Sequence, residues 1–286
     1  MEDQNAIIRS RNKDITDAIT YAKHIQDGIL PSSSEVTKYL PNSFVHYQPK
    51  SIVSGDFYWM HNRGNEILFS VADCTGHGVP GAFMSMMGVA LLNEIVSEHE
   101  TSCPQDIINL LRDGIIKALN KGREEYKISD GMDACLCSFD KSNNVLQFSG
   151  ANNSLYVTRK VGEPALETLE NELIEPILSN ETHLLYEIKG DKQPIGYYDG
   201  KGKPFRKTIL QLCPNDHIYL SSDGFQDQIG GPKGKKFLTK RFKELILSLA
   251  PSALSQQKEI LSTTIANWME PNFEQTDDIC IWGVKV

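Results

Sequence analysis

The sequence predicts an α+β fold whose sheets are largely antiparallel. Predicted strands and helices are grouped in blocks and do not alternate as strand–helix–strand units. The links between neighbouring strands are short, and short links join antiparallel strands. Two long helices follow each other between two blocks of strands, and two more precede the last strand. We therefore expect one domain in which helices cover both outer faces of a pair of sheets.

The composition is that of a globular chain, with 286 residues, 40% of them hydrophobic, which is enough to bury a sizeable core. Its net charge of -8 argues against nonspecific nucleic-acid binding, which needs clustered Lys and Arg. The six cysteines lack CxxC or Cys/His ligand spacing, so we interpret them as reduced core residues. There is no signal-like apolar segment at the N-terminus, and no apolar run reaches about 18 residues. We expect a cytoplasmic chain without a membrane span.

Residues 1–30 are predicted to form one amphipathic helix that ends at Leu30-Pro31. Its apolar residues recur at seven-residue spacing, namely Ile8, Ile15, Ala22 and Ile29, with Ile19 and Ile25 between them. Two interpretations stay open: a helix packed on its own domain, or a coiled-coil seam that joins two chains or continues from an upstream signalling domain. We therefore divide the chain into residues 1–30, a linker or dimerisation helix that we expect to transmit regulation, and a domain at 31–286.

Three strands and two helices are predicted in the first half of that domain. After a polar, capped stretch at 32–40, the strands lie at 43–48, 55–60 and 67–72, the second and third joined by a turn at 62–65. Residues 82–96 are apolar nearly all round and predict a buried helix, which Pro80 and Gly81 begin. A second helix, from 104 to about 121, has one apolar face and ends at Gly122.

The second half is predicted to be mostly β-structure. Turn sequences rich in Asn, Pro and Asp separate several of the strands, at 134–139, 145–148, 155–159, 184–188, 205–212 and 217–221. The acidic segment 162–180 is expected to be an exposed excursion without chemistry. Helices at 239–249 and 252–268 precede a closing strand at 279–286.

Aspartates stand where several of these predicted strands begin or end. They are Asp56 in SGDFYW, Asp73 in VADCTGHG, Asp223 in YLSSDGF, and Asp277 with Asp278 in QTDDICIW. An unpaired buried carboxylate costs several kcal/mol, so each needs a cationic partner, and Lys and Arg are scarce near these motifs. Oxygen ligands without His/Cys spacing select hard ions, so the set predicts Mg²⁺ or Mn²⁺.

Weaker interpretations stay open for single residues. Any one of these aspartates, taken alone, is more often a turn or cap acid, as we expect for Glu66, Asp106 and Asp216. His77 lies between two glycines and is either a general acid or phosphate contact, or a group that orients its own turn.

Seven motifs taken together resemble the SpoIIE/RsbU-like branch of the PPM-type (type 2C) metal-dependent protein serine/threonine phosphatases. In chain order they are SGDFYW, VADCTGHGVPGAF, SDGMDACLCSFD, GANNSLY, DKQPIG, SSDGFQDQIGGPKGKKF and TDDI. The resemblance covers about residues 25–286. It implies a four-layer α-β-β-α sandwich with two antiparallel sheets, and a centre of two Mn²⁺ or Mg²⁺ ions at the sheet edges.

The resemblance also implies roles for individual residues. Asp56 and Asp73 would bridge the two metal ions, Asp223 would hold one of them, and the backbone carbonyl of Cys74 would be a further ligand. Asp277 matches the closing acid of the family, with Asp278 as the alternative.

Other family features have no match in this chain. Asn152 and Asn153 stand where many relatives have an acid linked to a third ion, which makes a third ion doubtful here. No arginine matches the phosphate-binding arginine of eukaryotic members. Lys233, Lys235 and Lys236 are either substrate contacts or a solvated loop, and we favour the solvated loop.

The activity that the resemblance implies is hydrolysis of phosphoserine or phosphothreonine on a small regulatory protein of the STAS type, an anti-sigma factor antagonist. In this chemistry the metal ions activate a water, and His77 or a metal-bound water protonates the leaving oxygen. The alternatives are a non-catalytic or weak module of the same fold, a hydrolase of small phosphoesters, and a structural coiled-coil protein. The sequence does not name the phosphoprotein or the activating signal.

Overall fold

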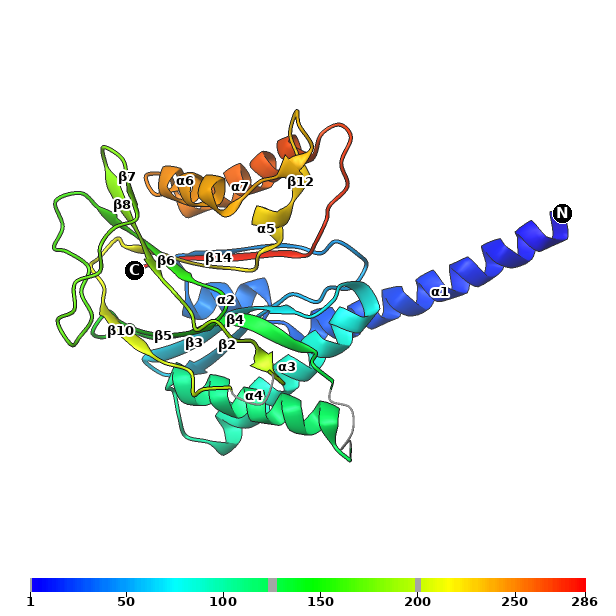
Figure 1. The fold of residues 1–286 in the computed structure, drawn as a ribbon, viewed down its shortest axis with the longest axis horizontal. Coiled ribbons are helices and arrows are strands. Elements are labelled where there is room, and N and C mark those ends of the chain that lie inside the picture. The colour runs from blue at the N-terminus through cyan, green and yellow to red at the C-terminus, as the bar shows by residue number, and fades with distance from the viewer. Residues whose placement is uncertain (1, 123–127, 199–201) are drawn as a thin grey trace.

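The protein is described here by a computed structural model that covers residues 2–122, 128–198 and 202–286, with side chains from residue 4. Two antiparallel sheets lie face to face, and a pair of helices covers each outer face (Figure 1). Helices α3 (Gly78–Glu98) and α4 (Pro104–Asn120) cover one sheet, and α6 (Thr239–Leu249) and α7 (Leu254–Met269) cover the other. The predicted α+β class and the four-layer α-β-β-α sandwich are confirmed.

The first sheet has the strand order β1-β14-β11-β6-β8-β7 and carries α6 and α7. Its strands are β1 (Ser43–Gln48), β14 (Ile279–Lys285), β11 (His217–Ser221), β6 (Leu155–Lys160), β8 (His183–Ile188) and β7 (Leu178–Ser179). The second sheet has the order β10-β5-β4-β3-β2, with β9 (Ile195–Gly196) paired to β4. Its strands are β10 (Thr208–Gln211), β5 (Val145–Ala151), β4 (Gly131–Asp140), β3 (Glu66–Cys74) and β2 (Phe57–Arg63). A small hairpin joins β12 (Ile229–Gly230) and β13 (Lys235–Lys236).

The four layers explain why the central strands are apolar on both faces. Alternate side chains of a strand point to opposite faces of its sheet. In β3, Phe69 packs against the core between the sheets, where Trp282 of β14 also lies. Leu68, its neighbour, belongs to the core beneath α3 and α4. A strand buried on both faces has no polar alternation, so its sequence is a continuous apolar run.

Most predicted elements are confirmed, and the differences lie at their ends. The polar stretch at 32–40 contains a helix, α2 (Ser33–Tyr39), whose first turn donates the Glu35 N–H to the Ser32 hydroxyl at 3.2 Å. The second strand begins at Phe57 and not at residue 55, because Gly55 lies in a loop that packs on another backbone segment. The strand predicted at 205–212 is limited to Thr208–Gln211.

The segment 162–180 is mostly exposed, as predicted, but it is anchored to the sandwich at Leu166 and β7. Leu166 is fully buried in the core between the sheets, and Leu178–Ser179 pairs with β8 as β7. Arg159 of β6 donates to the backbone carbonyls of Pro164 and Ala165 at 2.9 and 3.0 Å. The same guanidinium group pairs with Asp216, so Asp216 is a buried ion-pair partner and its prediction as an ordinary turn acid was wrong.

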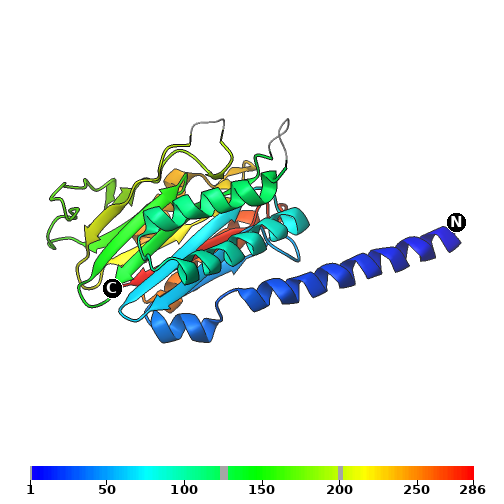
Figure 2. The ribbon, with the colours of Figure 1, turned by 90° about the horizontal axis from the view of Figure 1, so that it is seen from below.

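Helix α1 (Glu2–Ile29) runs away from the sandwich as a long single rod (Figure 2). The helix itself was predicted. Its isoleucines are exposed along most of its length, with Ile8 54% and Ile15 59% exposed. Among its described side chains only Gln26 is buried, at 2% exposure. The first interpretation, a helix packed on its own domain, therefore fits only the last two turns of α1. The earlier turns extend away from the domain.

Two expectations about apolar residues can be compared with the structure. All six cysteines are free, and four of them are buried, as expected for reduced core residues.

In the described residues, α3 is the one helix with the length and mean hydropathy of a membrane span, although half of its most apolar 18-residue stretch is buried in the protein. Because α3 packs on α4 and the second sheet, burial in a core accounts for its apolar sequence.

Candidate functional site

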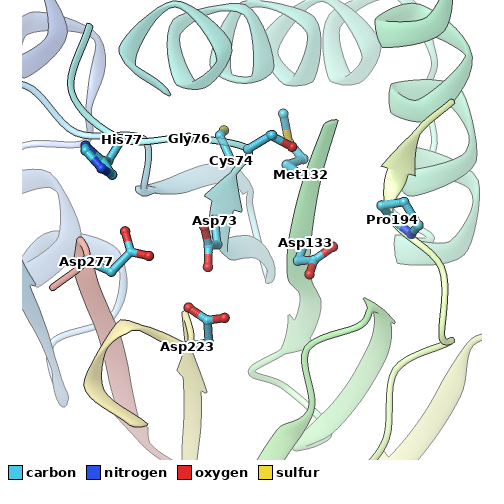
Figure 3. A pocket seen from close by; sticks show the side chains of 10 residues that line it. Asp73, Cys74, Gly76, His77, Met132, Asp133, Pro194, Asp223 and Asp277 are labelled. Carbon is cyan, nitrogen blue, oxygen red and sulfur yellow. The ribbon is translucent and has the colours of Figure 1, made fainter. Parts of the chain in front are cut away.

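A pocket of about 240 Å³ opens where strands of both sheets end (Figure 3). Four carboxylates line it, and they come from four separate segments: Asp73, Asp133, Asp223 and Asp277. Asp73, Asp223 and Asp277 point toward one another across the space. Cys74, Thr75, Gly76, His77, Met132 and Pro194 complete the lining. The structure therefore brings together acids that are up to 204 residues apart, Asp73 and Asp277, in one pocket.

Strand pairing brings these acids close together in space. Asp73 lies at the end of β3 and is directly opposite Asp133 at the start of β4, because the two strands are antiparallel. In the first sheet, β11 ends just before Asp223 and its antiparallel neighbour β14 begins just after Asp278. Antiparallel pairing places the end of one strand beside the start of the next. Each pair of acids is thus fixed by a strand register.

Glycines allow the loops of the site to pack backbone against backbone. A Cβ atom on Gly55 would lie 2.5 Å from the carbonyl oxygen of Gly76, and one on Gly81 would lie 2.4 Å from the same oxygen. A Cβ on Gly224 would meet the carbonyl oxygen of Asp278 at 1.9 Å. No larger residue fits at these distances, so the glycines in the motifs are required by close approach.

Asp56 is not among the residues that line the pocket, and it is only 2% exposed. Its Oδ2 atom is buried and has no hydrogen-bond partner. Burial raises the pKa of Asp56 well above its usual value, the Ser222 hydroxyl opposes this shift, and the charges of Asp278, Asp277 and Asp223 add to it. Burying a carboxylate oxygen without a hydrogen-bond donor costs free energy unless a cation binds to it.

The other acids also crowd one another. Burial, followed by the charges of Asp56 and Asp223, raises the pKa of Asp73 to about 10. Burial raises the pKa of Asp223 as well, and the nearby Lys236 lowers it only in part. Lys236 is itself paired with Asp227 at 2.7 Å. The pocket therefore holds more acids than basic groups, and their raised pKa values show that the ionised carboxylates are unfavourable there without a nearby cation.

Asp277 and Asp278 occupy different environments although they are adjacent. Asp277 lines the pocket and accepts the backbone N–H of Asp278 at 2.8 Å. Asp278 is 2% exposed, and its two carboxylate oxygens accept the backbone N–H groups of Lys50 and Gly55, both at 2.7 Å. Asp278 thus fastens the loop before Asp56, whereas Asp277 faces the open space.

His77 is at the pocket wall and has a cationic neighbour that the sequence did not indicate. The Lys50 Nζ and His77 Nε2 atoms are 3.0 Å apart. An ammonium group is a donor only, so the Nε2 atom of His77 is the acceptor in this contact. A lysine 27 residues away along the chain has no sequence signal for this contact.

Asp133 is the carboxylate that the sequence interpretation missed. It lies in the pocket, and burial raises its pKa, although a hydrogen bond from Asn152 to its Oδ1 atom, 2.8 Å long, opposes the shift. It stands within the SDGMDACLCSFD motif, at the start of a strand, which is the context that identified the other acids. Asn152, predicted to replace an acid, thus contacts one.

Comparison with known proteins gives the family. Residues 63–286 match the family model described as Stage II sporulation protein E (SpoIIE). The chain belongs to the SpoIIE family. No curated protein matches the sequence. The SiaA-PP2C domain of Pseudomonas aeruginosa is 30% identical, with a TM-score of 0.80, over 96% of this chain and 98% of that one.

Two more distant structures share the fold of this SpoIIE-family chain. The PP2C phosphatase domain of SpoIIE from Bacillus subtilis, with a fragment of its regulatory domain, has a TM-score of 0.62 at 17% identity and is matched over 86% of this chain and 63% of that one. The catalytic domain of the serine/threonine phosphatase PstP, in complex with two manganese ions, has a TM-score of 0.52 at 13% identity over 85% and 96%. This chain is thus a PP2C-type phosphatase domain with the PPM fold.

The donor set of this SpoIIE-family site fits a hard divalent ion. Its candidate ligands are carboxylate and carbonyl oxygens. The buried Oδ2 atom of Asp56 accepts no hydrogen bond in the described structure, so its lone pairs are available to a metal ion. In the described residues, no three His, Cys, Asp or Glu side chains are already spaced as a metal site. The family match begins at residue 63, so the candidate role of Asp56 depends on its position beside this pocket and not on that match.

Proposed function

We propose that this domain is a metal-dependent protein serine/threonine phosphatase. The observation that carries the proposal is the convergence of Asp73, Asp223 and Asp277 on one pocket, with the buried Asp56 close enough to feel their charges. Four acids without an equal number of basic partners need divalent cations to neutralise them. The family and its fold support phosphate-ester hydrolysis as the chemistry of such a site.

The proposed metal ligands come from different segments of the chain. Asp56 and Asp73 would hold both ions, the Cys74 carbonyl and Asp223 would complete the set, and Asp277 would close it from the first sheet. Asp278 would support the site without binding a metal ion directly, because both of its carboxylate oxygens already accept backbone N–H groups. Two Mn²⁺ or Mg²⁺ ions would supply an activated water and neutralise charge on the phosphoryl group.

Lys50 and His77 would act on the substrate side of the pocket. His77 lines the wall and accepts a hydrogen bond from the Lys50 ammonium group, which keeps this cation beside the pocket. A fixed cation at this edge can contact phosphoryl oxygens, a role for which the sequence offered no arginine. In this arrangement His77 Nε2 is occupied, so we propose that His77 orients Lys50, in place of the general-acid role considered from sequence.

The size of the pocket favours a phosphorylated side chain of a protein as substrate. Its volume of about 240 Å³ is smaller than the roughly 300–1,000 Å³ typical of small-molecule sites. A phosphoseryl side chain needs only a small, polar space of this kind, whereas a nucleotide needs more. We propose a small phosphorylated regulatory protein of the STAS type as the substrate class, and a cytoplasmic location for the reaction.

The test uses phosphorylated STAS proteins, phosphoserine peptides, nucleotides and p-nitrophenyl phosphate with the purified chain. We expect phosphate release from the phosphoproteins with Mn²⁺ and loss of that release with excess chelator, restored by added Mn²⁺. Faster hydrolysis of nucleotides than of any phosphoprotein would favour the small-phosphoester alternative. Absence of hydrolysis with every substrate, together with binding of a phosphoprotein, would favour the non-catalytic module.

We further propose that α1 pairs with α1 of a second copy of this chain. Its isoleucines stand at heptad spacing and are exposed over the part of the helix that leaves the domain. A seam of this kind buries its apolar residues only against a partner helix. The charged side chains of α1, unlike its isoleucines, are solvated by water and need no partner helix.

The substitutions Ile8→Glu and Ile15→Glu, made together in the full chain, test this pairing. We expect light scattering to show a dimer for the parent and a monomer for the double variant, because like charges would face each other in the seam. Asp14→Asn, on the same helix, is the matched control and should leave the dimer intact. A parent chain that is monomeric at all concentrations contradicts the pairing.

A further inference from the structure

A cavity of about 560 Å³ lies at the opposite end of the first sheet from the acidic pocket. Strand β11 begins in this cavity with His217 and ends just before Asp223. Its neighbour β14 begins just after Asp278 and ends in the cavity with Lys285. The link between α6 and α7, residues 250–253, and the first turn of α7 form the other wall. The cavity and the acidic pocket thus share two strands but no lining residue.

The charge of this cavity is opposite to that of the acidic pocket. Lys285 lines it, and among the described residues no Asp or Glu does. None of the ion pairs in the described parts of the chain includes Lys285. A cavity lined by charge of one sign raises the local concentration of ions of the other sign. Lys285 therefore favours an anion.

Helix α7 begins at the same cavity, with Leu254 and Ser255 in its lining. The first N–H groups of a helix have no partner within the helix. The N-cap residue is Ala253, no side chain caps this end in the described structure, and the first turn holds no acidic residue. The N–H groups and the positive end of the helix dipole are thus available to an anion.

His217 is an independent sign of a ligand. It is 5% exposed, and its buried Nδ1 atom has no hydrogen-bond partner. Its ring lies on the same face of the sheet as Tyr219, whose hydroxyl group donates to Gln257 of α7 at 2.9 Å. The ring therefore faces the α7 side, where it lines the cavity. Burial, followed by the charges of Lys285 and His183, lowers the pKa of His217 to about 4, so the ring is neutral at pH 7.

We propose that this cavity binds a small phosphate ester, with its phosphate group between Lys285 and the N-terminus of α7. The ammonium group, the helix N–H groups and the hydroxyl groups of Ser252 and Ser255 supply more donors than one carboxylate uses. The volume lies within the roughly 300–1,000 Å³ typical of small-molecule sites and leaves room for an organic body beside Phe44 and Leu254. The inference does not depend on the proposed phosphatase activity.

Calorimetric titration of the full chain with phenyl phosphate tests the proposal. Divalent ions are first removed with chelator and dialysis, so that the probe is neither hydrolysed nor held by metal ions at the acidic pocket. We expect one binding site per chain, tighter for phenyl phosphate than for inorganic phosphate or benzoate. We also expect phenyl phosphate to raise the melting temperature of the metal-free chain.

Three variants locate the site. Lys285→Met should weaken binding about tenfold or more, because it removes a charge-assisted hydrogen bond. Ser255→Asp places a carboxylate at the N-terminus of α7, where it stabilises the helix but repels a phosphate group. We expect this variant to lose binding while its ligand-free melting temperature stays equal or rises, which separates loss of the site from loss of the fold.

His217→Phe keeps a flat buried ring and removes both nitrogen atoms. It should weaken binding of phenyl phosphate without lowering the ligand-free melting temperature, because the parent gains nothing from an unpartnered buried nitrogen. Lys117→Met is the matched control, because Lys117 is an exposed lysine of α4 on the other sheet. Its affinity should equal that of the parent.

The contrary outcomes are equally specific. Absence of phenyl phosphate binding to the metal-free parent at millimolar concentrations would overturn the site, as would unchanged affinity in folded Lys285→Met and Ser255→Asp. Equal affinity for benzoate and phenyl phosphate would overturn the assignment to phosphate esters. None of these results depends on Mn²⁺ or on hydrolysis, so the proposed phosphatase function stands or falls separately.

Discussion

Replacing Asp73 by asparagine is expected to lower Mn²⁺-dependent turnover about a thousandfold, which corresponds to about 4 kcal/mol of transition-state stabilisation. Asp73 lies at the centre of the pocket and points toward Asp223 and Asp277. Asparagine keeps the shape of the side chain but removes the negative charge that a divalent ion needs. The measurement is the rate of p-nitrophenyl phosphate hydrolysis over a range of Mn²⁺ concentrations.

The fold of this variant should remain intact. Loss of one carboxylate reduces the repulsion among the acids of the pocket, so the metal-free melting temperature should stay equal or rise, while its increase on addition of Mn²⁺ should be lost. Asp113→Asn is the matched control, because Asp113 is exposed on α4 outside the pocket lining. Normal Mn²⁺-dependent hydrolysis by Asp73→Asn would refute the assignment of the metal centre.

Replacing Asp216 by alanine is expected to lower the free energy of unfolding by about 3–5 kcal/mol. Arg159 and Asp216 are each 1% exposed in their side chains, and they are joined by contacts of 2.6 to 3.1 Å. Asp216 also accepts the backbone N–H of Cys213 at 2.8 Å. Alanine would leave a buried guanidinium charge without its carboxylate, which is the costliest way to break such a pair.

Urea denaturation of three variants measures this effect. Arg159→Met combined with Asp216→Ala should recover part of the loss, because no charge is left unpaired, but not all of it, since Arg159 also donates to the carbonyls of Pro164 and Ala165. Asp27→Ala breaks the exposed ion pair with Lys23 and should cost less than about 1 kcal/mol. A loss below about 1 kcal/mol for Asp216→Ala would contradict the assigned importance of the buried pair.

Several elements could be predicted from the chain because their patterns are local. The strand at 43–48 and the helix at 239–249 coincide with β1 and α6. The acids of the site were found because each follows or precedes an apolar strand, a position where a carboxylate is expensive without a cation.

Other features depend on pairing between distant segments. Asp216 looked like a turn acid because its partner, Arg159, is 57 residues away. Asp133 has the strand-start context that identified the other acids, but its place in the pocket follows from the register between β3 and β4. The Lys50–His77 contact and the anchoring of α1 by Gln26 are likewise set by packing.

The sequence by itself determined the α+β class, the order of the elements and the acidic residues from which the site is built, because hydrophobic periodicity and strand-end carboxylates are properties of neighbouring residues. The tertiary structure decided which of those acids face the pocket, with Asp277 inside it and Asp278 bound to backbone N–H groups. It also decided that Gln26 reaches the Asp56 segment. These choices depend on strand register and on the path of α1, which only contacts between distant residues can fix.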